Sequence, residues 1–326
     1  MKKVSWLNYL ITISIIIIGC AFCNNKNVNA MSSLNGYYEY DFIKKEETFG
    51  EISNTKIDLA NNVSDGSLGS LPYTSEIEPH TVIGSDGRSE VKNTTSIPVR
   101  WVGYLLSYWP DGKVTRGTAW LYGDSVAMTA GHCIYDYDKQ TYPSKITFSP
   151  GYNNGEAPYG TFSVSRGRVT QQYRNNRDSR YDAGIIKLSS PIGKKVGYFS
   201  FAYNDNVDAY LNKSVWIDGY PGDKDRKMYR MQDTIQKATE NNLYYQIDTY
   251  AGQSGSPIFY KDPNDANKRI CIGIHTNGVP KGFIDVPRNS GVRICKMMYN
   301  WMKTTQEKWM TDVEPPIFTD GSEFWP

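Results

Sequence analysis

The chain has 326 residues, of which 39% are hydrophobic and 21% charged, so it is long enough to form two packed units. Its formal net charge of +2 is too balanced to indicate a nucleic-acid partner, and we predict none. Aromatic residues reach 13%, with 25 tyrosines, a composition that favours β structure over helix.

The first 30 residues are typical of an export signal. Lys2 and Lys3 precede an apolar run over residues 10–18, which is too short to span a membrane as a mature helix. Residues 28–30 (VNA) offer a site for signal peptidase, whereas residues 17–20 (IIGC) resemble a lipobox with Cys20 as the lipidated residue. We therefore predict a signal peptide over residues 1–30 and a secreted protein without a stable membrane span. Transient lipoprotein anchoring through Cys20 is the alternative.

Residues 31–80 are polar and contain few apolar side chains, which predicts a removable propeptide. From residue 82 onward, short apolar and aromatic runs recur between turn signals. The runs that we predict as strands are 98–105, 117–122, 126–129, 145–148, 161–169, 185–188, 214–218, 244–247, 257–260, 270–275 and 291–294. Because helices do not alternate with these strands, the pattern indicates an all-β fold of antiparallel barrels or sandwiches.

The C-terminal region contains the best helix candidate, residues 295–307, where Met298, Trp301 and Met302 recur at helical spacing. The sequence then becomes acidic and contains prolines. We place the boundary of a C-terminal tail at residue 304 and extend it to residue 326.

Five cysteines are present, and two of them fall in the predicted signal. The other three are Cys133, Cys271 and Cys295, an odd number, so at most one disulfide can form among them. Cys271 and Cys295 would pair if their strands were neighbours; the alternative is three buried thiols. No Cys and His cluster has the spacing of metal ligands, and we predict neither a metal nor a cofactor.

Three short segments carry the residue types of nucleophilic catalysis. They are 129–133 (TAGHC), 181–184 (YDAG) and 252–257 (GQSGSP). A serine hydroxyl is a poor nucleophile until a neutral imidazole takes its proton and a carboxylate fixes the tautomer of that imidazole. His132, Asp182 and Ser254 supply these groups in the chain order of two-barrel serine proteases, and the chain has only three histidines.

The glycines around Ser254 fit the same chemistry. An oxyanion hole needs two backbone N–H groups aimed at one point, which requires an unusual backbone path, and Gly252 and Ser254 would donate them. An α/β-hydrolase is excluded because its nucleophile turn needs glycine two residues after the serine, where Ser256 stands.

The chain resembles the bacterial glutamyl endopeptidases, secreted trypsin-fold serine proteases, from about residue 82 to about residue 301. The shared strings are 82–88 (VIGSDGR), 129–136 (TAGHCIYD), 219–224 (GYPGDK), 248–257 (DTYAGQSGSP) and 275–279 (HTNGV). The resemblance implies two antiparallel six-stranded β-barrels with a C-terminal helix. The first barrel would span residues 81–190, and the second barrel with the helix would span 191–303.

The resemblance also implies a pocket that reads a glutamate side chain, with His275 and the hydroxyl of Thr249 as substrate-binding groups. Burying a carboxylate without partners is costly, and an imidazole that becomes protonated beside it offsets that cost. The implied cut between His80 and Thr81 would free the α-amino group of Thr81, which helps to bind the substrate carboxylate. Asp248 is a warning, because trypsin-like enzymes place an acid at that position in the pocket.

One position departs from the family. The Bacillus members have a cysteine where Gly117 stands, and that cysteine pairs with the one matching Cys133. The disulfide cannot form here, which leaves Cys133 as a free thiol beside the base.

We therefore predict a secreted, monomeric serine endopeptidase that cleaves after glutamate and less well after aspartate. Its partners would be proteins or peptides with acidic residues and an activating protease that removes the propeptide. Two alternatives remain, a protease similar to exfoliative toxins with one narrow substrate, and an inactive binding protein on a protease fold. The intact series of His132, Asp182 and Ser254 argues against the second alternative.

Overall fold

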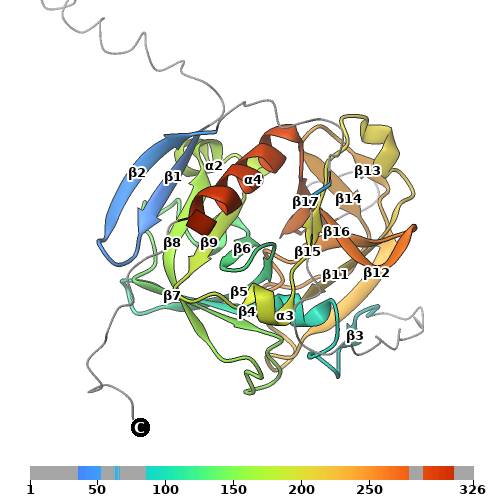
Figure 1. Cartoon of the computed structure of the whole chain (residues 1–326), viewed down its shortest axis with the longest axis horizontal. Coiled ribbons are helices and arrows are strands. Elements are labelled where there is room, and N and C mark those ends of the chain that lie inside the picture. Colours follow the sequence, from blue (N-terminus) through green and yellow to red (C-terminus); the bar gives the residue numbers. More distant parts are fainter. Residues whose placement is uncertain (1–35, 53–62, 65, 67–85, 279–288, 312–326) are drawn as a thin grey trace, which may run out of the picture. The chain divides into compact units, whose positions relative to one another are not determined.

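The computed structural model describes residues 36–52, 63, 64, 66, 86–278 and 289–311. The predicted signal peptide, the cut after His80 and residues 312–326 lie outside these residues. Strands dominate the described part, as the composition indicates, and they form two sheets (Figure 1).

The first sheet contains a closed barrel. Its strand order is β2-β1-β8-β7-β4-β5-β6-β9, and an additional pairing of β8 with β9 closes the six strands from β8 to β9. The bounds are β1 Gly36–Asp41, β2 Glu46–Glu51, β4 Val102–Tyr108, β5 Val114–Leu121, β6 Val126–Thr129, β7 Lys145–Pro150, β8 Phe162–Thr170 and β9 Gly184–Leu188. All pairings in this sheet are antiparallel, which confirms the first predicted barrel.

The second sheet is a half-barrel. Its order is β13-β14-β17-β16-β15-β11-β12-β3, with β10 paired to β16. The bounds are β3 Ser89–Glu90, β10 Ser200–Phe201, β11 Ser214–Gly219, β12 Tyr229–Thr234, β13 Lys237–Ala238, β14 Asn242–Tyr245, β15 Pro257–Asp262, β16 Asp265–Asn277 and β17 Asn289–Arg293. We expected a second closed barrel. Instead, the described strands form an open path. β12 and β13 follow each other in the chain, separated by Ile235 and Gln236, but no hydrogen-bonded ladder between them closes the sheet.

The C-terminal helix α4 spans Lys296–Thr311 and is longer than predicted. Met298, Trp301 and Met302 are buried, as their spacing indicates, and Trp309 is buried as well. The burial of Trp309 explains why the helix continues past residue 304, where we placed the start of the tail. No helix among the described residues is long and apolar enough to cross a membrane. The other helices, α2 Gln171–Asn176 and α3 Gly193–Val196, are short.

The hairpin β1–β2 lies inside the segment that we predicted to be a polar propeptide without a core of its own. β1 pairs with β8 from Tyr37 opposite Thr170 to Asp41 opposite Arg166. The apolar content of the segment did not predict a strand, because the hairpin is completed by an edge of β8 that lies far away in the sequence. In Figure 1 the blue hairpin lies beside β8 and α2.

The three described cysteines, Cys133, Cys271 and Cys295, are all free thiols. A Cys271–Cys295 disulfide is therefore absent. Cys271 is buried within β16, whereas β17 ends at Arg293, before the chain reaches Cys295 and turns into α4.

Candidate active site

His132 and Asp182 meet at one end of two paired strands. β6 ends at Thr129, which lies opposite Gly184 at the start of β9. The segment after β6 carries His132, and the segment before β9 carries Asp182. Asp182 Oδ2 lies 2.6 Å from His132 Nδ1, and Asp182 Oδ1 accepts the backbone N–H of His132 at 2.8 Å. This double contact fixes both the position and the orientation of the imidazole ring.

The electrostatic surroundings of His132 favour its charged form. Burial alone would lower the pKa of His132, but the attraction of the Asp182 carboxylate and the neighbouring Cys133 outweighs it, so the pKa of His132 is raised well above its usual value. Asp182 itself is buried, with 3% of its surface exposed. The arrangement stabilises an imidazolium ion, the species that a general base becomes after it takes a proton.

The loop before β15 has the backbone path that an oxyanion hole requires. Gly252 has φ of +106° and Gly255 has φ of +91°, conformations that strongly favour glycine. The N–H of Gly255 donates to the carbonyl of His275 at 2.7 Å. In contrast, no described residue accepts a hydrogen bond from the N–H of Gly252 or of Ser254. These two N–H groups are the pair that we assigned to an oxyanion hole from the sequence, and that role stays a prediction.

Thr118 is a site residue that sequence analysis missed. It lies in β5 of the first barrel and is fully buried. Its N–H donates to the carbonyl of Ser254 at 2.9 Å, and its hydroxyl donates to the carbonyl of Gly252 at 3.0 Å. Thr129, three residues before His132, donates its hydroxyl to the Thr118 carbonyl at 2.8 Å. Thr118 thus connects the serine loop to the segment that carries His132, and no local sequence signal marks it.

His275 lies in β16 next to the same loop and is only 4% exposed. Its N–H donates to the carbonyl of Ser256 at 2.9 Å, and its Nδ1 is 2.7 Å from the hydroxyl of Tyr245. Burial and, to a smaller extent, the charge of His132 lower the pKa of His275 to about 3, against the opposing effect of a hydrogen bond to the Ser290 backbone. The imidazole is therefore neutral. Tyr245, which contacts its Nδ1, is a second site residue that sequence analysis missed.

The two other predicted pocket groups differ in what the structure describes. Thr249 is partly buried in the loop that follows β14, with no described contact to His275. Thr81 lies outside the described residues. Asp248 is exposed, and its carboxylate accepts the N–H of Gly87 at 2.9 Å. That bond joins the carboxylate to the backbone of the segment that follows the predicted cut.

An ion-pair network holds residues 86–88, the first described residues after the predicted cut. Arg88 contacts Asp86 at 2.9 Å and Asp223 at 2.8 Å, and Lys224 contacts Asp86 at 2.9 Å. These pairs lower the pKa of Asp86 and of Asp223, mainly through the side-chain hydrogen bonds from Arg88. The network brings residues 86–88 beside residues 223–224, two of the strings on which the family resemblance rests.

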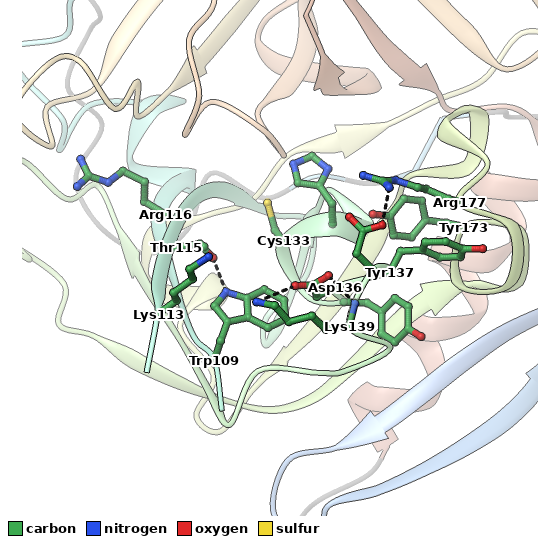
Figure 2. A pocket seen from close by; sticks show the side chains of 13 residues that line it. Trp109, Lys113, Thr115, Arg116, Cys133, Asp136, Tyr137, Lys139, Tyr173 and Arg177 are labelled. Carbon is green, nitrogen blue, oxygen red and sulfur yellow. Dashed lines mark hydrogen bonds and ion pairs between the residues drawn. The ribbon is translucent and has the colours of Figure 1, made fainter. Parts of the chain in front are cut away.

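A cleft of about 260 Å³ opens beside His132 and Cys133 (Figure 2). Trp109 and Arg116 come from the edge of the first barrel, and Tyr173 comes from α2. At the wall of this cleft, a β-carbon placed on Gly117 would lie 3.6 Å from the Cβ of Cys133. The structure thus brings Gly117 and Cys133 together, as the resemblance implies, and Cys133 is a free thiol.

Comparison with known proteins identifies the family. The sequence pattern of the Trypsin family matches residues 109–287, more than half of the chain. The chain belongs to the trypsin family of serine proteases. It is 34% identical to the glutamyl endopeptidase of Bacillus licheniformis over 276 residues, which cover 82% of this chain and 84% of the relative. The resemblance to the glutamyl endopeptidases is confirmed.

Two further trypsin-family comparisons add detail. A solved structure of a Glu endopeptidase in complex with MPD superimposes with a TM-score of 0.60 at 28% identity, covering 69% of this chain and 99% of that chain. The chain is also 33% identical to a Bacillus subtilis protein named an extracellular metalloprotease over 226 residues, 69% of each. The described residues contain no group of three His, Cys, Asp or Glu side chains that could hold a metal ion, so the metal in that name has no counterpart among them.

Proposed function

We propose that this trypsin-family serine protease is an exported endopeptidase that cleaves after glutamate, and less readily after aspartate. The observation that carries the proposal is His275, a buried imidazole beside the serine loop that contacts the hydroxyl of Tyr245. The relatives named glutamyl endopeptidase support the same specificity.

In the proposed reaction, Ser254 Oγ attacks the scissile carbonyl carbon while His132 Nε2 takes the hydroxyl proton. Asp182 accepts the hydrogen bond from His132 Nδ1 and stabilises the imidazolium that forms. The C–N bond then breaks as His132 returns the proton to the leaving amine. Water hydrolyses the resulting ester of Ser254 by the same proton transfers in reverse order.

The N–H groups of Gly252 and Ser254 would hold the oxyanion during both steps. Removing one donor of this kind typically costs about 3 to 4 kcal/mol of transition-state stabilisation. Thr118 supports the hole from the first barrel, because it binds the carbonyls of both residues and so restrains the backbone that follows each donor. Its burial keeps water from competing for those carbonyls.

The specificity follows from what a carboxylate would meet at His275. A neutral imidazole with a pKa of about 3 offers one N–H, and a nearby carboxylate would raise that pKa so that the ring takes up a proton. Thr249 would add a neutral donor.

Export and processing complete the proposal. The predicted signal peptide over residues 1–30 and the propeptide cut between His80 and Thr81 support a secreted zymogen. A relative from Bacillus subtilis carries the word extracellular in its name. The Thr81 amine would then be available for the substrate carboxylate, and protein or peptide chains with acidic residues would be the substrates.

The test compares three otherwise identical peptides with Glu, Gln or Lys before the scissile bond. We expect kcat/KM for Glu to exceed that for Gln by at least about ten-fold, because a charge-assisted hydrogen bond replaces a neutral one. Equal values for Glu and Gln would overturn the pocket assignment. Labelling by a fluorophosphonate in the wild type, and its loss in Ser254→Ala, tests the nucleophile separately.

A further inference from the structure

The hairpin β1–β2 is built into the first barrel, although it lies inside the predicted propeptide. β8 pairs with β7 only at Phe162 and Ser163, and β1 takes over the same strand from Arg166 to Thr170. The turn of the hairpin and the residue after β2 also contribute to the core, since Phe42 and Ile52 are buried. Without the hairpin, this half of β8 would present an open strand edge.

Arg168 is the clearest sign that the hairpin is anchored to the barrel. It points from β8 and is 1% exposed. Its Nε lies 2.5 Å from Glu39 of the hairpin, and its guanidinium lies between the rings of Tyr37 and Trp309, 4.4 and 4.5 Å from their centroids. A second nitrogen donates to Thr305 of α4 at 2.7 Å. Removing the hairpin would leave a buried cation without its carboxylate, which is strongly unfavourable.

A second cluster fastens the other strand of the hairpin. Glu47 accepts two hydrogen bonds from Arg174 of α2, both at 3.1 Å, and one from the hydroxyl of Tyr142 at 2.6 Å. Tyr142 also stacks on Tyr40 with ring centroids 4.3 Å apart. These contacts are independent of those at Arg168, so the hairpin is held at both of its strands.

A third contact joins the same segment to the second sheet. Ser64 donates its N–H to the carbonyl of Phe201 at 2.8 Å, and its hydroxyl accepts the N–H of Phe201 at the same distance. Val63 pairs with Ala202 in an isolated bridge. Phe201 belongs to β10, which pairs with β16, the strand that carries His275. The segment before the predicted cut therefore contacts both sheets.

The hairpin also braces the segment that carries Asp182. The β1 ladder ends at Thr170, whose hydroxyl donates to the carbonyl of Tyr181 at 2.5 Å, one residue before Asp182. Arg174, bound to Glu47, lies in the helix between these two points. Loss of the hairpin would free the part of β8 and α2 that positions the orienting carboxylate.

We propose that β8, α2 and α4 form a binding surface for residues 36–52, and that this segment stays bound as a separate chain after the cut in front of the first barrel. The mature enzyme is then a two-chain protein in which the former propeptide supports the Asp182 segment. The proposal rests on the cut between His80 and Thr81 that is part of the proposed function. It differs from a removable propeptide in that the cleaved segment stays bound to the enzyme.

The experiment uses the full chain with Ser254→Ala, in which residues 74–80 are replaced by the recognition sequence of tobacco etch virus protease. After cutting is complete on a denaturing gel, the protein is passed through a size-exclusion column under native conditions. We expect the N-terminal fragment to co-elute with the C-terminal body. Elution of the fragment apart from a body that keeps its near-UV circular dichroism would overturn the proposal.

Matched variants test the contacts. Glu39→Gln should speed fragment dissociation about 10- to 100-fold, because it removes a charge-assisted hydrogen bond to a buried cation. Glu47→Gln tests the second cluster in the same way. Glu51→Gln changes an exposed carboxylate of the same hairpin and should leave the rate unchanged. Equal rates for all three variants would overturn the proposed surface.

These readouts do not depend on the proteolytic activity of the chain itself, because it carries Ser254→Ala and the cut is made by the added protease. The peptide assay on the wild type tests the proposed function by itself. If the N-terminal fragment stays bound but the wild type does not cleave the glutamate peptide, only the proposed function is refuted. If the wild type cleaves the peptide but the fragment is released, only the inference is refuted.

Discussion

His132 and His275 show how the same side chain acquires opposite properties in the two sheets. His132 faces the Asp182 carboxylate and its pKa is raised well above the usual value. His275 is enclosed by β strands and faces the Tyr245 hydroxyl, and its pKa is lowered to about 3. In both places burial disfavours the charged ring, and at His132 the Asp182 carboxylate, with Cys133, reverses that effect. The difference teaches that His132 carries its counter-charge within the protein, whereas His275 has none among its described partners and, in our proposal, meets one in the substrate.

The strongest test removes the carboxylate of the first histidine. Asp182→Asn should lower kcat about 10⁴-fold, because the ring then loses the tautomer that accepts the serine proton. The pKa of His132 should fall as well, so the acid limb of the kcat/KM profile should move to lower pH. Measuring both quantities separates an electrostatic role from a collapse of the loop, since a collapsed loop would lower kcat without moving the limb.

A covalent brace tests the loop that holds His132. Gly117→Cys would place two β-carbons 3.6 Å apart, within the range of disulfides. Closing a loop of about 15 residues stabilises a protein by about 3 kcal/mol. We expect a higher midpoint of urea unfolding in the oxidised variant that dithiothreitol reverses. Gly117→Ser is the control, and an equal midpoint in both variants would contradict the prediction.

The second histidine is tested by its effect on specificity. His275→Gln should reduce kcat/KM for the glutamate peptide about 10- to 100-fold, while the glutamine peptide changes little, because only the charged side chain uses the imidazolium. The rate of fluorophosphonate labelling serves as the control for an intact nucleophile. A parallel loss on both peptides would assign His275 to the core instead of the pocket.

The opposite shifts also predict opposite effects of pH on stability. His275 binds a proton more readily in the unfolded chain, so its contribution is complete above about pH 6.5 and is lost as pH falls toward 3, by about 2 kcal/mol at pH 5. The His132–Asp182 pair acts in the other direction and stabilises the fold most below the ordinary histidine pKa. The contribution of His275 is isolated by comparing Ser254→Ala with Ser254→Ala/His275→Gln, each unfolded in urea at pH 7.5 and pH 5. The free energy of unfolding should fall by about 2 kcal/mol more in Ser254→Ala, and an equal change in both variants would argue against the lowered pKa.

The smallest expected effect concerns the partner of His275. Tyr245→Phe removes one hydrogen bond to Nδ1, worth about 1 kcal/mol. The ratio of kcat/KM between the glutamate and glutamine peptides should fall by several-fold, with kcat for the glutamine peptide unchanged. An unaltered ratio would show that Tyr245 does not orient the imidazole.

Local sequence predicted much of the fold. Alternating apolar and aromatic runs located most strands of both sheets, and the spacing of Met298, Trp301 and Met302 located α4. β12 and the hairpin β1–β2 were missed because their side chains are largely polar or half-buried. Their strand structure comes from ladders with β11 and β8, and neither run is apolar enough to mark a strand by itself.

The sequence by itself determined which groups can react. His132, Asp182, Ser254 and the glycines beside the serine are recognisable because chemistry restricts those positions to few residue types. Only the tertiary structure decided their surroundings. Thr118 supports the serine loop and Tyr245 meets His275 because strands distant in the chain pack together. Threonine and tyrosine are common in any β protein, so no local pattern distinguishes these two. Burial in the fold, together with the charge of His132, lowers the pKa of His275.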